Sequence, residues 1–243
     1  MWSLFRKEIS QLFNSLTAYM VIVVFLLVNS LFIWVFPGQM NIMDSGYASL
    51  DPLFVIAPWI FLLLVPAVCM RLFSEEKKNG TIELILTKPL SDWEITFAKY
   101  MAGLSLVLFS LIPGLIYFLS VYFLGNPVGN MDTGGTWGSF IGLFFLAAVY
   151  VAIGVFSSSI TDNQIVAFLI GMVLSFFFYM GFEQISGLLP ASQFSLFLNG
   201  MGIMPHYQHM SKGVLDLRDT IYFLSIIALF LFTTKIILQS RKW

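Results

Sequence analysis

The chain has 243 residues, of which 58% are hydrophobic, 17% aromatic and only 10% charged, and its mean hydropathy is +0.88. These values exclude an ordinary soluble globular protein and indicate an integral membrane protein. The formal net charge of −1, without a long basic run, excludes a general attraction for nucleic acid. Cys69 is the single cysteine and lies in an apolar run, so we expect neither an internal disulfide nor a cysteine metal site.

A short charged segment, residues 1–11, precedes the first long apolar run. We expect it to form an amphipathic helix along the membrane surface. Its charges are those of Arg6, Lys7 and Glu8. Its expected inward face consists of Trp2, Phe5 and Ile9. A signal peptide also has a basic start and an apolar run, but the run from Thr17 to Phe36 is about 20 residues long and no small-residue cleavage site follows it. We therefore expect a retained first span.

Apolar runs long enough to cross a bilayer recur along the chain, separated by turn-forming residues. The six expected spans are residues 17–36, 53–70, 95–124, 137–156, 165–182 and 221–238. Asp51 before Pro52 predicts the start of the second span, and the capping-box spacing of Thr161 and Gln164 predicts the start of the fifth. The segment 183–219 is too broken to cross a bilayer, so it is expected to be re-entrant or interfacial. The predicted fold is all-α, a single polytopic membrane domain covering residues 1–243.

The stretch from Arg71 to Asp92 crowds charges of both signs between two apolar runs, so it must face water or a polar partner. Gly80 predicts the end of a helix, because glycine tolerates the left-handed backbone conformation. Thr81 can cap a short amphipathic helix that follows. Its apolar face would consist of Ile82, Ile85 and Leu86, with Glu83 pointing elsewhere.

Two further signals end this polar stretch. Pro89 stops the short helix, since the residue before a proline avoids helical geometry. Ser91 and Glu94 have capping-box spacing and predict the start of the third span. The order is therefore helix, break, short amphipathic helix, break, helix.

Six crossings place both chain ends on one side, and the distribution of lysine and arginine predicts which side. With a cytoplasmic N-terminus, the basic residues on or near the cytoplasmic side are Arg6, Lys7, Arg71, Lys77, Lys78, Lys88, Lys99, Lys235, Arg241 and Lys242. Only Lys212 and Arg218 lie on the external side. We therefore predict cytoplasmic N- and C-termini, with the polar stretch in the cytoplasm.

No P-loop, H-E-x-x-H or G-x-S-x-G motif occurs in the 243 residues, so no catalytic, cofactor-binding or metal residue is expected in this chain. His206 and His209 can share a helix face, but without a third ligand an ordinary surface pair is the simpler interpretation. Lys99 and Lys235 lie near span ends, where they can snorkel, and Asn29 is the chief polar residue inside a span. A proton- or sodium-coupled carrier is therefore disfavoured, because it needs titratable or coordinating groups near the bilayer midplane.

Residues 73–84, FSEEKKNGTIEL, resemble the polar segment between the second and third spans of ABC-2 type transporter permeases, and residues 87–91, TKPLS, continue the pattern. Residues 157–168, SSSITDNQIVAF, resemble more narrowly the turn before the fifth span in gliding-motility permeases of the GldF type. The external segment resembles theirs at residues 206–207, 211–214 and 217–223. These similarities keep their order over nearly the whole chain.

The resemblance implies the membrane half of an exporter in the bacterial inner membrane, with a separate cytoplasmic ATPase that binds ATP and Mg²⁺. It also implies that the short helix is a coupling helix. The implied ATPase contacts are Glu75, Glu76, Lys77, Gly80, Thr81, Ile82, Glu83, Ile85 and Leu86. A hinge at Gly80 would let the helix dock at an angle. The alternative is that its apolar stripe lies on the membrane surface.

Six spans are a small unit in which to enclose a transport path, so we expect a homodimer or a pair with a second permease chain. Candidate positions for close helix contacts are Gly142, Gly154, Gly171 and Gly181. An ATP-driven exporter permease is the first functional interpretation. The alternative is a membrane scaffold that helps to assemble or energise a motility or secretion apparatus without moving a solute.

Overall fold

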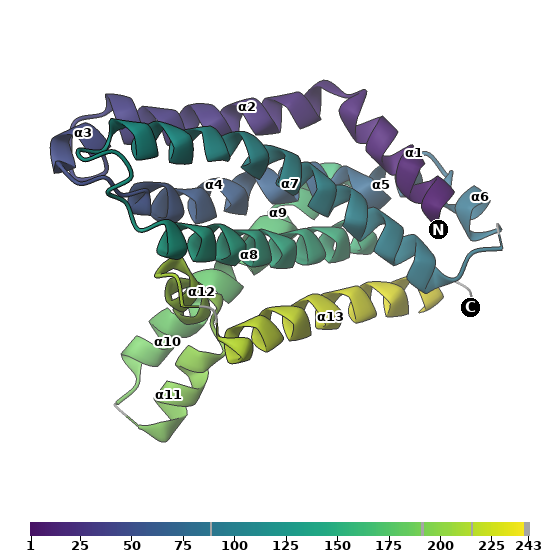
Figure 1. Ribbon diagram of the computed structural model, residues 1–243. Coiled ribbons are helices and arrows are strands. Elements are labelled where there is room, and N and C mark those ends of the chain that lie inside the picture. Colours follow the sequence, from purple (N-terminus) through teal and green to yellow (C-terminus); the bar gives the residue numbers. More distant parts are fainter. Residues whose placement is uncertain (88, 191, 215, 241–243) are drawn as a thin grey trace.

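The computed structural model describes residues 1–87, 89–190, 192–214 and 216–240. Three of the basic residues used to predict the orientation in the membrane lie outside the described residues: Lys88, Arg241 and Lys242. The side chains of Ile85 and Leu86 also lie outside the description. Within the described ranges, every regular element is a helix (Figure 1).

Among the described residues, six helical segments are long and apolar enough to cross a membrane, as the sequence predicts. They are α2 (Leu16–Ser30) with η1 (Leu31–Val35), α4 (Asp51–Cys69) with α5 (Arg71–Lys78), α7 (Asp92–Leu124), α8 (Thr133–Ile160), α9 (Gln164–Phe176) with η2 (Phe177–Gly181) and α10 (Phe182–Leu188), and α13 (Leu217–Ser240). The shorter helices are α1 (Trp2–Phe13), α3 (Ile42–Ser45), α6 (Ile82–Leu86), α11 (Gln193–Gly200) and α12 (Ile203–Ser211).

The start of α1 and the end of α13 lie at one end of the helix bundle, and α3 lies at the other (Figure 1). We call these the N/C end and the far end. The polar break between α5 and α7 is at the N/C end, whereas α10, α11 and α12 lie toward the far end (Figure 1). The distribution of basic residues predicts that the N/C end faces the cytoplasm.

Helix α8 is the centre of the bundle, because 78% of its most apolar window is buried, against 22% for the span that begins with α9. Small residues bring neighbours close to it: a Cβ on Gly154 would lie 2.5 Å from the Cβ of Cys69 in α4. A Cβ on Gly142 would lie 2.7 Å from the Cβ of Met210 in α12. Such close packing is what holds helices together in a bilayer, where burial of apolar surface from water contributes little.

The other two glycines predicted at close helix contacts differ from each other. A Cβ on Gly171 of α9 would lie 2.8 Å from the Oγ of Ser157 in α8, so this position is a close contact between helices. Gly181 faces Phe177, one turn earlier in its own span. The absence of a side chain at Gly181 therefore makes room for the Phe177 ring within the same span.

The predicted capping box of α7 is confirmed. The Ser91 N–H donates to Glu94 Oε2 at 2.9 Å, and the Glu94 N–H donates to Ser91 Oγ at 3.3 Å. The predicted cap of α9 is wrong, because Asn163 is the cap and its Oδ1 accepts from the Ile165 N–H at 2.9 Å. The short amide side chain reaches the N–H two residues on, and Thr161 stays outside the helix.

The predicted inward face of α1 is correct only in part, because Phe5 and Ile9 are partly buried against the core but Trp2 is not. Trp2 is 71% exposed, and the buried residues Leu4, Glu8 and Leu12 form a line of i, i+4 neighbours. Helix α1 packs on α7. The carboxylate of Glu8 therefore lies at the centre of the contact between α1 and α7. The cation with which it pairs, described below, explains why this face of α1 turns inward.

Candidate functional site

Helix α5 ends in the turn that the sequence predicts. Gly80 has φ +68°, its N–H donates to the Lys77 carbonyl at 3.2 Å, and the Thr81 N–H donates to the Glu76 carbonyl at 2.9 Å. These two bonds are those of a Schellman motif, which requires a left-handed residue and so favours glycine. The Thr81 hydroxyl also donates to the Glu76 carbonyl, at 3.3 Å. The start of α6 is therefore fastened to the backbone of Glu76.

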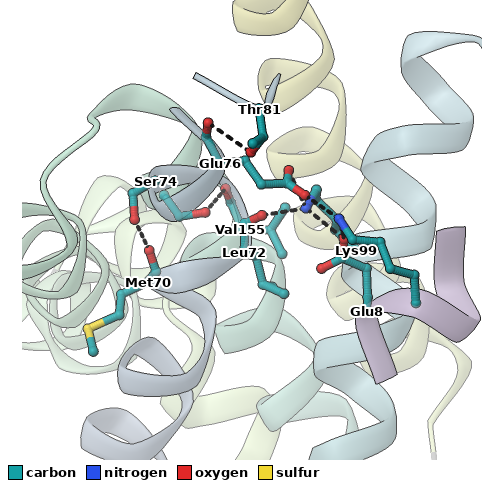
Figure 2. Close-up of polar contacts among 10 residues, drawn as sticks. Glu8, Met70, Leu72, Ser74, Glu76, Thr81, Lys99 and Val155 are labelled. Atoms are coloured by element: carbon teal, nitrogen blue, oxygen red, sulfur yellow. Dashed lines mark hydrogen bonds and ion pairs between the residues drawn. The ribbon is translucent and has the colours of Figure 1, made fainter. Parts of the chain in front are cut away.

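The side chain of Glu76 points the other way, into a buried group of charges (Figure 2). Lys99 Nζ lies 2.7 Å from Glu76 Oε2 and 3.0 Å from Glu8 Oε1. Lys7 Nζ lies 2.8 Å from Glu76 Oε1 and 3.5 Å from Glu8 Oε1. We call Lys7, Glu8, Glu76 and Lys99 the ion cluster. It joins α1, α5 and α7.

Most of the ion cluster is removed from solvent. The exposed fraction of the side chain is 0% for Lys99, 4% for Glu8 and 7% for Glu76. Lys99 also donates to the Leu72 carbonyl, and its ammonium lies 4.9 Å from the centroid of the Phe73 ring. An isolated buried charge costs several kcal/mol, but here two ammonium groups balance two carboxylates. Charge is therefore balanced within the ion cluster, and the fully buried ammonium of Lys99 is the cation whose loss would leave the two carboxylates least compensated.

Lys7 is the member of the ion cluster that reaches water, with a side chain 50% exposed. Burial by itself lowers its pKa, but the hydrogen bond and charge of Glu76, together with the charge of Glu8, raise the pKa above the ordinary lysine value. Lys7 is consequently a cation throughout the physiological pH range.

The prediction that Lys99 snorkels to the membrane surface is wrong, because carboxylates from two other helices hold its ammonium inside the bundle. A sequence signal for this site does exist. Glu8 lies four residues from both Leu4 and Leu12, so it interrupts the apolar face of a short helix. A carboxylate there needs a buried cation.

The residues predicted to contact an ATPase differ in how far they are buried, and they fall into three groups. Those turned into the chain are Glu76 and Ile82, which is 8% exposed. Lys77 and Glu75 are half-buried, and Lys77 donates to the carbonyl of Ser159 at the end of α8. The exposed ones are Gly80, Thr81 and Glu83. Leu84, beside Glu83 and not among the predicted contacts, is 65% exposed.

The two histidines lie at the far end and share one carboxylate. His206 Nδ1 lies 2.6 Å from Asp219 Oδ1, and His209 Nδ1 lies 3.6 Å from Asp219 Oδ2. His206 Nε2 also faces the Gly200 carbonyl at 2.9 Å, and the ring stacks on Tyr222 at 3.9 Å. These contacts tie α12 to the start of α13.

The family model described as ABC-2 family transporter protein matches residues 2–242. The chain belongs to the ABC-2 transporter family. It is therefore a multi-pass membrane protein and a transmembrane permease subunit of an ABC exporter, and membership implies association with an ABC ATPase. A search among curated proteins gives no match.

In this ABC-2 permease, Glu76 connects the exposed break to the span helices in two ways. Its carbonyl accepts both hydrogen bonds from Thr81 at the start of α6. Its carboxylate pairs with Lys99 of α7 and Lys7 of α1. Helix α5 in turn continues the span of α4. Displacement of α6 would therefore act on α4, α7 and α1 together.

Proposed function

We propose that this permease lies in the bacterial inner membrane and couples ATP hydrolysis by a separate cytoplasmic ATPase to export of a substrate. The ATPase, and not this chain, binds ATP and Mg²⁺. The observation that carries the proposal is the double role of Glu76, which holds α6 by its carbonyl and two other helices by its carboxylate. Helix α6 is short and lies at a chain reversal, so a partner that closes on it has a direct route to the spans.

The proposed ATPase contact region is the segment from Glu75 to Leu86, and its residues form two sets with different roles. The exposed residues Thr81, Glu83 and Leu84 touch the ATPase. Glu76 and Ile82 transmit the displacement from inside the chain, because a buried group moves only with its neighbours. Gly80 is the hinge between the two sets.

A second permease chain completes the exporter, as a homodimer or a heterodimer. The spans that begin with α9 and α2 have only 22% and 28% of their most apolar windows buried. These faces are available to lipid and to a second permease chain, and the transport path would lie between two chains.

The narrower proposal is a link to gliding motility, and it rests on the resemblance of residues 157–168, 206–207, 211–214 and 217–223 to gliding-motility permeases. A scaffold that energises a motility or secretion apparatus without moving a solute would use the same ATPase contact. Inverted membrane vesicles distinguish the two. ATP-dependent uptake supports export, whereas ATP hydrolysis without a transported species supports the scaffold.

The first experiment is purification of the tagged chain in a mild detergent, followed by mass spectrometry of accompanying proteins and an ATPase assay. Leu84→Glu alters the exposed side of α6, and Leu217→Glu is the matched control, since Leu217 is 78% exposed at the start of α13. We expect a P-loop ATPase with the original chain and with Leu217→Glu, and its loss from Leu84→Glu. An ATPase retained by Leu84→Glu with unchanged hydrolysis would contradict docking through α6. No accompanying ATPase in any mild detergent would contradict the exporter.

A further inference from the structure

The far end of the bundle contains a cleft of about 1310 Å³ formed within a single chain. Its walls come from η1, α3 and the loop after it, α4, the end of α7, the start of α8 and the connection between them, η2 and α12. Ligand sites are typically clefts of about 300 to 1,000 Å³ lined by aromatic and apolar side chains with a few polar groups. This cleft is large enough for the polar head of a lipid and part of its chains.

The chemistry of the cleft changes with depth along α4. Asp51, Val55 and Trp59 all line it and follow one another at intervals of four residues. A helix rises about 1.5 Å per residue, so Trp59 lies about 12 Å further into the span than Asp51. Trp59 there packs edge-on against Tyr179, with ring centroids 5.7 Å apart. The mouth is therefore charged and the inner part is aromatic.

One wall of the cleft belongs to an apolar stripe on α4. Val55 is 50% exposed and Trp59 is 42% exposed, and Leu63, four residues further along the helix, is 51% exposed. The stripe lies on a helix that is long and apolar enough to cross a membrane. Apolar chains that pack along this stripe would stay out of water, whereas a polar group would remain at the charged mouth. An amphipathic lipid therefore fits this cleft better than a soluble solute.

The mouth of the cleft carries charges of both signs, from Asp51, Asp132 and Lys212. The start of α8 and the end of α12 meet there, because a Cβ on Gly213 would lie 2.5 Å from the Cα of Gly135. Within the part of the chain that the structure describes, these three charges make no ion pair with one another. Two carboxylates and one ammonium are complementary to a headgroup that carries both an ammonium and a phosphate.

We propose that this cleft binds a zwitterionic phospholipid with a primary ammonium headgroup, of the phosphatidylethanolamine class. The phosphate pairs with Lys212, and the ammonium donates to Asp51 and Asp132. The acyl chains lie along Val55 and Trp59. Binding requires neither ATP nor an ATPase, so the lipid site and the proposed exporter function can be tested separately.

The test uses the full chain reconstituted in liposomes that contain phosphatidylethanolamine with a photoactivatable diazirine on an acyl chain. Crosslinked peptides are mapped by mass spectrometry, with competition by unlabelled phosphatidylethanolamine or by phosphatidylglycerol. We expect labelling concentrated at residues 55–59 and on the facing part of α12, displaced by the zwitterionic lipid and far less by the anionic one. Labelling spread evenly over the exposed faces of α2, α9 and α13, or equal competition by both lipids, would overturn the proposal. Absence of label at residues 55–59, as when a second copy covers them, would also overturn it.

Two variants separate the site from ordinary lipid contact. Lys212→Gln removes the phosphate partner, and Arg218→Gln is the control, because Arg218 is exposed near the same end but does not line the cleft. We expect competition by phosphatidylethanolamine to weaken by about fivefold to tenfold in Lys212→Gln, the effect of one lost hydrogen bond of ordinary strength at an exposed position. Arg218→Gln should match the original chain. Equal behaviour of the two variants would overturn the headgroup assignment, and both changes are at exposed positions that leave folding intact.

Discussion

The ammonium of Lys99 lies 3.0 Å from a carboxylate oxygen of Glu8, although 91 positions separate the two residues in the chain. The pair is buried and fixes α1 against α7. Glu76 closes the same cluster from α5, 2.7 Å from Lys99. The N-terminal helix is thus joined by ion pairs both to α7 and to α5, the helix that precedes α6.

Replacing Lys99 by methionine should lower the free energy of unfolding by about 3 to 5 kcal/mol, because Glu8 and Glu76 would keep only the half-exposed Lys7 as a counter-charge. Chemical or thermal unfolding in detergent measures the loss. Lys78→Met is the control, since Lys78 is exposed at the end of α5, the helix that carries Glu76, and should change stability by less than about 0.5 kcal/mol. Equal effects would show that the ion cluster contributes little.

Lys7 gives the ion cluster a defined pH dependence. Its pKa is raised in the folded chain, so its contribution to stability is fully present below the unfolded value, about 10.4, and is lost as pH rises through the higher folded value. The difference in stability between the original chain and Lys7→Gln should be constant from about pH 7 to 9 and shrink by about pH 11. Because the side chain is half exposed, we expect a difference below about 1 kcal/mol. A difference that changes between pH 7 and 9 would contradict this assignment.

Substitutions of Gly80 should follow the backbone requirement of the turn. A Cβ at Gly80 meets no atom within 4 Å, so the effect of a side chain comes from φ +68° alone. Asparagine tolerates this conformation better than alanine, which costs about 1 kcal/mol. Proline would also remove the N–H that bonds to Lys77. We expect ATPase binding and coupled hydrolysis to fall from glycine to asparagine to alanine to proline, and unchanged values for Gly80→Pro would refute the hinge.

Gly154→Ala should test the packing of α8 on α4. The new Cβ would lie 2.5 Å from the Cβ of Cys69, which cannot rotate away, so overpacking should cost about 1 to 3 kcal/mol. Gly187→Ala is the control, because a Cβ there meets no atom within 4 Å. Thermal unfolding of both variants in the same detergent gives the comparison. Restoration of stability by adding Cys69→Gly would assign the cost to this contact.

Features that depend on a few neighbouring residues could be predicted from the sequence. The apolar runs indicate six membrane-crossing helices, and the described part of the chain contains six segments long and apolar enough to cross a membrane. Ser91 and Glu94 begin α7, and Gly80 ends the preceding helix, because caps and left-handed turns are decided by local backbone geometry. Both Thr161 and Asn163 can cap the start of α9. The capping-box spacing of Thr161 and Gln164 predicted the wrong one, because the cap is Asn163.

The sequence by itself determined that this is a membrane protein with a polar break between its second and third spans, since hydropathy and turn chemistry are properties of short segments. Only the tertiary structure decided that Glu8, Glu76 and Lys99 share one buried cluster, and that Asp51 and Lys212 border one cleft. Each of these sites is made by helices far apart in the chain. Which side chains meet depends on how the helices pack, and packing is a relation between segments that residue spacing within one segment does not contain.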